Sequence, residues 1–124
     1  MRKILKNYSS ILQNLRLIKR YKENRWREQN RMWSEAALGE DEQGNVLFMF
    51  SRSPYTMYDF NQELISLGVV AAQHLEGGPE AQLYINLPNH TYEMFGSYET
   101  SFVEDDSNDR TWSIPNVIGI RMKE

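Results

Sequence analysis

A helix with a defined start and end lies between two apolar runs, and this pattern limits the folds open to the chain. Residues 46–50 are apolar throughout, which is typical of a strand buried on both faces. Thr56, with Asp59 three residues later, is a capping box, and Gly68 marks the helix end. The apolar positions that share one face of this helix are Met57, Phe60, Leu64, Ile65 and Leu67. Since residues 67–72 form a second apolar run, the pattern predicts a strand–helix–strand unit.

The first third of the chain is less defined. Residues 1–13 are predicted to be a poorly ordered, basic start. Residues 14–18 alternate like a half-buried strand, although the apolar spacing from Ile4 to Ile18 also suits a helix. Residues 19–32 are polar and basic and predict a long exposed loop.

Short strands are expected on either side of the helical unit. Residues 33–39 predict a strand that forms a hairpin with residues 46–50, which are predicted to end at Ser51. Residues 86–90 predict a turn, and residues 117–120 a last short strand. The expected fold class is therefore α+β, a mixed β-sheet with one main helix over about residues 56–67, in a single domain spanning residues 14–124.

Composition excludes several classes of protein. The chain has 124 residues, no cysteine and no apolar run approaching the roughly 20 residues of a membrane span. Disulfide and thiolate chemistry are therefore excluded, and no secretory leader is recognisable at the start of the sequence. These observations leave the cellular compartment open.

Charge is distributed unevenly along the chain. Residues 1–33 carry ten Lys and Arg against two acids, whereas residues 34–124 carry four against fifteen. One reading is a basic arm for nucleic acid or anionic lipid. The other, which we favour because no nucleic-acid motif accompanies the basic residues, is attraction between two parts of one fold, or packing of the first segment on something now missing.

A histidine, a carboxylate and a glycine pair follow the second apolar run. Gly77 and Gly78 allow a tight turn or a close approach of backbone to a ligand, and Glu76 and His74 precede them. A hairpin turn with solvated acids is the alternative. Period two in a strand would place His74 and Glu76 on the same face.

The order of these motifs resembles the C-terminal half of the phosphodiester glycosidase family, which includes the enzyme that uncovers mannose 6-phosphate and many bacterial domains of unknown function. The resemblance runs from about Asn14 to the end, through residues 51–54, the helix, Glu76-Gly77-Gly78 and residues 115–120. It implies hydrolysis of a sugar–phosphate diester of the N-acetylglucosamine-1-phosphodiester type. Most of the family has aspartate where this chain has Glu76.

The resemblance also predicts a truncated domain. Upstream strands with an Asn-Gly-rich motif would normally precede the matched region. We expect a missing N-terminal half, or self-association through the sheet edge that those strands would cover. Full-length relatives are often exported to the periplasm or the exterior, but the compartment of this chain stays unknown.

The resemblance suggests roles for individual residues. Arg52 would bind phosphate oxygens, and the amides of Gly77 and Gly78 would add donors. Glu76 would be one catalytic carboxylate and Asp106 its partner, with Asp105 and Glu80 as weaker candidates. His74 would be a general acid, a partner that orients Glu76, or a structural histidine.

No cofactor is predicted. Neither histidine has a second ligand at metal-like spacing, which argues against zinc. Residues 104–109 are rich in oxygen ligands and form a candidate Ca²⁺ loop, although they lack the spacing of an EF-hand. Besides the glycosidase, the sequence leaves open a non-catalytic remnant, a carbohydrate-binding module, or an anionic-surface or nucleic-acid binder through residues 1–33.

Overall fold

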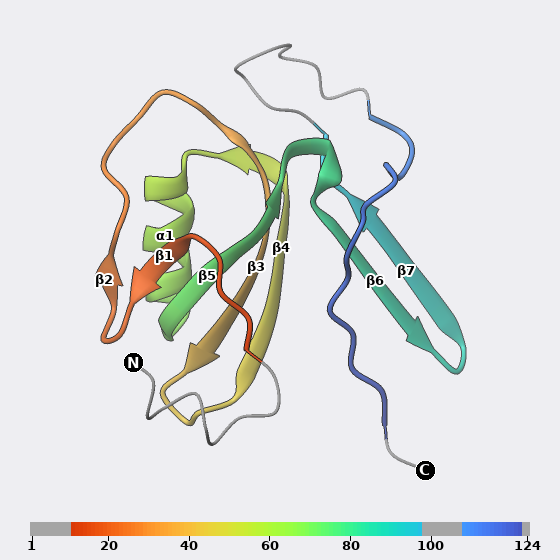
Figure 1. The fold of residues 1–124 in the computed structure, drawn as a ribbon, viewed down its shortest axis with the longest axis horizontal. Coiled ribbons are helices and arrows are strands. Elements are labelled where there is room, and N and C mark those ends of the chain that lie inside the picture. Colours follow the sequence, from red (N-terminus) through yellow and green to blue (C-terminus); the bar gives the residue numbers. More distant parts are fainter. Residues whose placement is uncertain (1–10, 98–107, 123–124) are drawn as a thin grey trace.

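The computed structural model describes residues 11–97 and 108–122. The expectations for residues 1–10 and 104–107 therefore lie outside the described residues. Elements follow in the order β1 (Arg16–Lys19), β2 (Glu23–Asn24), β3 (Trp33–Asp41), β4 (Val46–Tyr55), α1 (Met57–Ser66), β5 (Val69–Gly77), the 3₁₀ turn η2 (Gly78–Glu80), β6 (Gln82–Leu87) and β7 (His90–Phe95). Figure 1 shows α1 packed on one side of a five-stranded sheet, with the β6–β7 hairpin apart from it.

The sheet has the strand order β2-β1-β5-β3-β4, and every neighbouring pair is antiparallel. Both β4 and β5 pair with β3, so they run parallel to each other with β3 between them. The predicted strand–helix–strand unit is thus present, with a third strand inserted between its two strands. The α+β class with one α-helix is confirmed.

Helix α1 begins and ends where its sequence signals predict. The Thr56 hydroxyl accepts a hydrogen bond from the Asp59 amide at 3.0 Å, which satisfies one of the free amides of the first turn. Gly68 has φ +95°, a conformation that glycine adopts without strain. Met57, Phe60 and Leu64 are buried as predicted, but Leu67 is 79% exposed because it caps the helix beyond the last full turn.

The core lies between α1 and the sheet. Its buried apolar members are Leu17, Ile18, Ala37, Met57, Phe60, Leu64, Val69 and Ala72. A fully buried polar residue, Asn61, is embedded among them. Its amide nitrogen donates to the Leu17 carbonyl at 3.0 Å and to Asn24 Oδ1 at 2.8 Å, so it joins α1 to β1 and β2.

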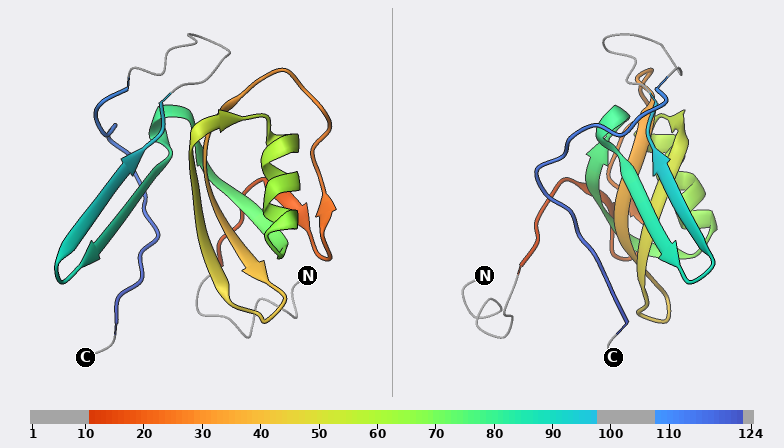
Figure 2. Two further views of the ribbon diagram at one scale, coloured as in Figure 1. Left: turned by 180° about the vertical axis from the view of Figure 1, so that it is seen from behind. Right: turned by 90° about the vertical axis from the view of Figure 1, so that its right-hand side faces the viewer.

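Strand β4 is longer and more exposed than predicted. It continues through Pro54 to Tyr55, because an edge strand pairs on one side only and tolerates the missing proline amide. Val46 is 65% exposed and residues 47–50 are half-buried, so the prediction that both faces are buried was wrong. Helix α1 covers the sheet from one side only (Figure 2).

The first third of the chain is more ordered than the sequence suggests. Of the two alternatives for residues 14–18, the strand is correct, since β1 covers Arg16–Lys19. The predicted loop at 19–32 contains β2, which forms a hairpin with β1 through a turn that places Lys22 at φ +57°. Ion pairs Arg20–Glu40 at 2.5 Å and Lys22–Glu42 at 2.7 Å link this basic region to the acidic part of the chain, as the favoured reading of the charge pattern expects.

The C-terminal part differs from prediction in two respects. The predicted turn at 86–90 is shorter, since β6 runs to Leu87 and β7 begins at His90. Residues 117–120 form no strand, and Val117 and Ile120 are 79% and 83% exposed. β-Branched residues favour a strand only where a partner strand accepts their hydrogen bonds, and the described chain provides none here. Within the described residues, no helix is long and apolar enough to cross a membrane.

Asn61 offers a test of this packing. We expect Asn61→Ala to lower the free energy of unfolding by about 2 kcal/mol, because the buried Leu17 carbonyl and Asn24 side chain each lose a donor. Urea denaturation followed by tryptophan fluorescence would measure the change. Glu63→Ala, at an exposed position two residues along the same helix, is the control and should change stability by less than about 0.5 kcal/mol.

Candidate functional site

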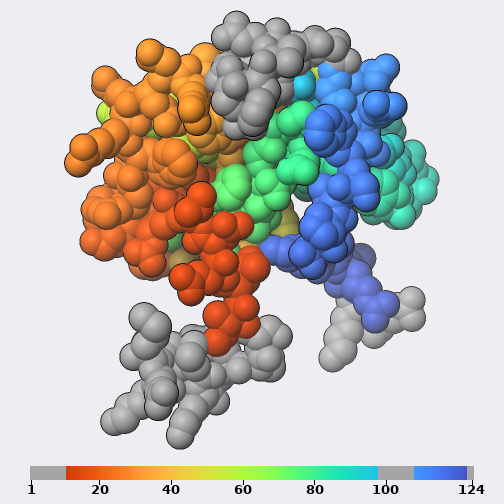
Figure 3. All heavy atoms as spheres, turned by 45° about the horizontal axis from the view of Figure 1, so that its top comes forward, coloured from red at the N-terminus to blue at the C-terminus, as the bar shows by residue number. Residues whose placement is uncertain are grey.

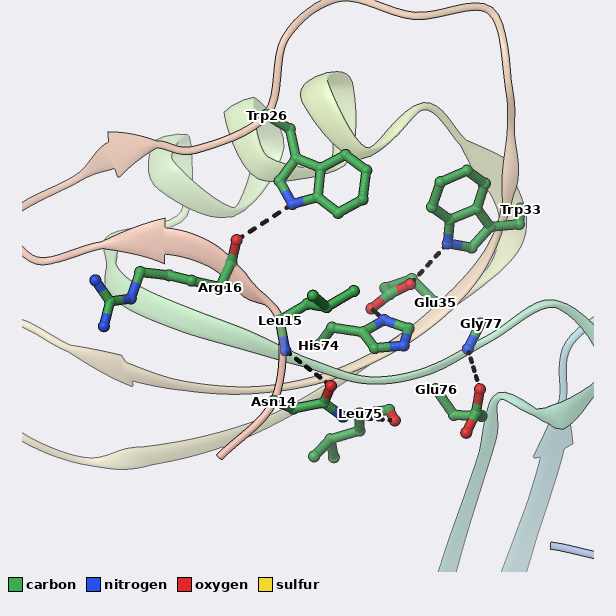
Figure 4. A network of polar contacts seen from close by, with 10 residues as sticks. All are labelled: Asn14, Leu15, Arg16, Trp26, Trp33, Glu35, His74, Leu75, Glu76 and Gly77. Atoms are coloured by element: carbon green, nitrogen blue, oxygen red, sulfur yellow. Dashed lines mark hydrogen bonds and ion pairs between the residues drawn. The ribbon is translucent and has the colours of Figure 1, made fainter. Parts of the chain in front are cut away.

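Three ionisable side chains gather where β5 ends. Glu35 comes from β3, and His74 and Glu76 come from β5. Figure 4 shows the Glu35 carboxylate between Trp33 and the His74 ring, while the Glu76 carboxylate lies at the Gly77 amide, apart from the Glu35 carboxylate. In Figure 3 the end of β5 reaches the surface between the N-terminal and C-terminal segments.

Glu35 is the buried member of this group. It is 0% exposed, and its two oxygens have different partners. Oε1 lies 2.6 Å from His74 Nδ1, and Oε2 accepts a hydrogen bond from Trp33 Nε1 at 2.9 Å. A buried carboxylate is costly unless it is paired, and these two contacts supply the pairing.

The pair holds protons more tightly than free side chains would. Burial raises the pKa of the Glu35 carboxyl, although the hydrogen bonds from His74 and Trp33 partly oppose this. Burial favours the neutral His74 ring, but the hydrogen bond and charge of Glu35, with the charge of Glu76, outweigh it and raise the pKa of His74. With Nδ1 held by Glu35, Nε2 has no hydrogen-bond partner among the described residues. His74 is therefore oriented to hold a proton at Nε2.

His74 was expected beside Glu76, and the structure pairs it with Glu35 instead. The strand register shifts between Ala36 and Ala37, opposite His74 and Glu76, so simple alternation fails at this point. Glu76 is exposed and its Oε1 lies 3.3 Å from the Gly77 amide. It nevertheless acts on both Glu35 and His74 through its charge.

The glycine pair is packed against protein atoms. A Cβ on Gly77 would lie 2.8 Å from Trp33 Cδ1 and 3.0 Å from its Nε1, so the indole occupies that space. Gly78 has φ +64° and begins η2, and its carbonyl oxygen would lie 2.0 Å from a Cβ on Gly96. Close packing thus accounts for glycine at 77 and 96, and backbone conformation accounts for it at 78.

Arg52 projects from β4 toward the chain that follows the β6–β7 hairpin. Its guanidinium donates to the carbonyls of Phe95 at 2.9 Å and Asn108 at 3.4 Å, and lies 5.7 Å from the centre of the Phe95 ring. Asn108 in turn donates to the Gly96 carbonyl at 2.6 Å. These contacts hold the residues after β7 against the sheet, and a role in binding phosphate stays a prediction.

The remaining candidates divide into two groups. Asp106 and most of the proposed Ca²⁺ loop lie outside the described residues. Glu80 is exposed in η2, and His90 packs on the Tyr92 ring in the exposed hairpin. No group of three or more His, Cys, Asp or Glu residues in the described ranges could hold a metal ion.

Sequence reasoning did not identify Glu35. It lies in the run predicted to be a strand, residues 33–39, in which it is the single charged side chain. A charged residue in a buried strand requires a partner, and that was the available signal. The identity of the partner depends on the pairing of β3 with β5, which local sequence does not specify.

The Glu35–His74 pair predicts how stability varies with pH. A group with a raised folded-state pKa contributes stability that is present below its unfolded pKa and lost as pH rises through the folded value. The pKa values of Glu35 and His74 are both raised, so both groups make the protein less stable as pH rises. His74 determines the pH range at the upper end, which begins at the unfolded pKa of histidine, about 6.5. We expect the free energy of unfolding, from urea titrations, to fall as pH rises above about 6.5. His74→Gln should flatten this slope and His90→Gln should retain it, whereas a wild-type value that rose with pH would contradict the assignment.

Comparison with known proteins identifies the family. The model of the phosphodiester glycosidase family matches residues 2–121, nearly the whole chain. Neither a curated protein nor a solved structure matches the chain significantly. Because the match extends through every strand and the helix that place Glu35, His74 and Glu76, we conclude that this chain belongs to the phosphodiester glycosidase family.

Proposed function

We propose that this protein hydrolyses a sugar–phosphate diester, of the N-acetylglucosamine-1-phosphodiester type, at the end of β5. Membership of the phosphodiester glycosidase family supports the reaction class. The assignment of residues rests on one observation. The buried Glu35 carboxylate lies 2.6 Å from His74 Nδ1, and the exposed Glu76 lies near the same strand end. His74 is the proton donor and Glu76 the carboxylate that faces the sugar.

The chemistry of the leaving group suits a histidine. When the bond between the anomeric carbon and the phosphate oxygen breaks, the departing group is a phosphate monoester, whose second pKa is about 6. A proton donor works best when its pKa lies near the working pH and near that of its acceptor. The raised pKa of His74 favours the protonated ring, with the proton available at Nε2.

Glu35 plays the part of an orienting carboxylate. It accepts from Nδ1 and so fixes the tautomer and direction of the ring, as the buried carboxylate of a hydrolase triad does. Because Glu35 is 0% exposed, it does not contact substrate itself. Its contribution is to hold His74 and to stabilise the imidazolium.

Glu76 supplies negative charge at the surface. Positive charge develops on the sugar ring as the glycosidic bond breaks, and a carboxylate next to the ring stabilises it. In the overall reaction, water oxygen bonds to the anomeric carbon, the phosphate oxygen leaves with the pair of bonding electrons, and it takes the proton from Nε2. The water proton is released to the carboxylate and returns to the histidine through solvent.

Paired variants test the residue assignment. With N-acetylglucosamine-1-phosphate methyl diester as substrate, His74→Gln and Glu76→Gln should each lower kcat/KM by about 10²- to 10⁴-fold, because each removes a group that acts on the reacting atoms. Glu93→Gln, an exposed carboxylate on β7, and His90→Gln are matched controls that should keep wild-type rates. Wild-type turnover by both site variants would overturn the assignment.

Hydrolysis in ¹⁸O-labelled water tests the reaction class. A glycosidase breaks the carbon–oxygen bond, so we expect mass spectrometry to find the label in the released sugar and none in the phosphate monoester. Label in the phosphate would mean attack at phosphorus and would contradict the proposal. Binding of the diester without turnover would instead support a non-catalytic carbohydrate-binding role.

A further inference from the structure

We propose that Trp33 is a positioning residue that holds Glu35 in place against His74 and links this pair to the glycine turn. The inference deepens the proposed function and, for its effect on catalysis, rests on it. Its main test is made on the protein alone, so the two proposals can fail separately.

The indole and the imidazole divide the two oxygens of Glu35 between them. Trp33 Nε1 donates to Oε2 at 2.9 Å, and His74 Nδ1 lies 2.6 Å from Oε1. Trp33 and Glu35 are two positions apart on β3, so both project from the same side of the strand. With both oxygens engaged, the buried carboxylate has a single orientation, and in that orientation Oε1 faces His74 (Figure 4).

Packing fixes the indole on two sides. Its Cδ1 and Nε1 fill the space that a side chain at Gly77 would need. A second contact is with the Trp26 ring, edge to face, with ring centres 6.1 Å apart and planes at 69°. The donor atom Nε1 therefore lies between Glu35 and the Gly77 backbone, and a shift at the glycine turn is transmitted to the carboxylate.

Besides Glu35, few charged groups of the described chain affect the pKa of His74. Among the residues that the structure describes, Glu76, on the same strand, is the other acid that acts on the ring. On the neighbouring strand β1, Arg16 pairs with Gln73, and its guanidinium points away from the ring in Figure 4. Helix α1 contributes no charge that acts on His74. The ionisation of Glu35 is therefore the main support for a protonated His74, and the Trp33 donor favours that ionised form.

Replacement of the donor gives the first test. In Trp33→Phe the carboxylate loses an N–H donor, so its ionised form is less favoured and the imidazolium loses support. We expect the pKa of His74, followed by NMR of its ring protons, to fall by on the order of one pH unit. His90 in the same sample serves as an internal reference. Trp112→Phe is the matched control: it removes an indole that is 49% exposed and keeps the Trp112 backbone carbonyl that accepts from Gln82, so His74 should titrate as in wild type.

A second variant leaves the tryptophan in place. Gly77→Ala puts a methyl group against Trp33 Cδ1 and Nε1 and should displace the indole, which lowers the pKa of His74 in the same direction. Gly119→Ala is the control, because nothing lies within 4 Å of the added carbon. Unchanged His74 titration in both Trp33→Phe and Gly77→Ala would overturn the inference.

Kinetics then separates the two proposals. If His74 donates a proton, the alkaline limb of kcat/KM against pH should move to lower pH in Trp33→Phe, by the same amount as the NMR shift. A shifted titration in a protein whose wild type shows no turnover would refute the proposed function and leave the role of Trp33 intact. If Trp33→Phe turns over substrate and neither its alkaline limb of kcat/KM nor its His74 titration differs from wild type, the role of Trp33 is refuted and the proposed function is not.

Discussion

A buried carboxylate is the constraint on which this structure depends at the end of β5. Glu35 has no contact with solvent, so its charge is tolerated only because His74 and Trp33 bind its two oxygens. That requirement places His74 on the adjacent strand, Trp33 two positions away and a glycine at 77 where the indole needs room. The site is therefore built outward from a residue that does not itself reach the surface.

The structure explains the glycine pair at 77 and 78 by close packing and backbone conformation of the protein itself. Its sequence suggests a turn where backbone approaches a ligand, yet Trp33 fills the space beside Gly77 and Gly96 packs on the Gly78 carbonyl. The pair lets β5, η2 and the residues after β7 come together closely. The sequence resemblance includes the same turn, and the tertiary contacts explain why small residues are needed there.

Short sequence signals correctly predicted the parts of the fold that depend on interactions between residues close together in sequence. The Thr56 cap and the Gly68 terminus of α1 depend on contacts within a few residues, and both formed as predicted. Predictions that depended on distant partners were less accurate. Pro54 lies in a strand because β4 is at an edge, and residues 117–120 form none because no described strand lies beside them.

By itself the sequence determined the α+β class, the helix and its limits, and the resemblance that the family comparison confirmed. It also marked His74 and Glu76 as candidates, because they precede a glycine turn after an apolar run. Only the tertiary structure decided which carboxylate meets His74. The two residues are 39 positions apart, and a register shift between β3 and β5 brings Glu35 to the ring. A register is set by the packing of the whole sheet, so no local pattern could specify that contact.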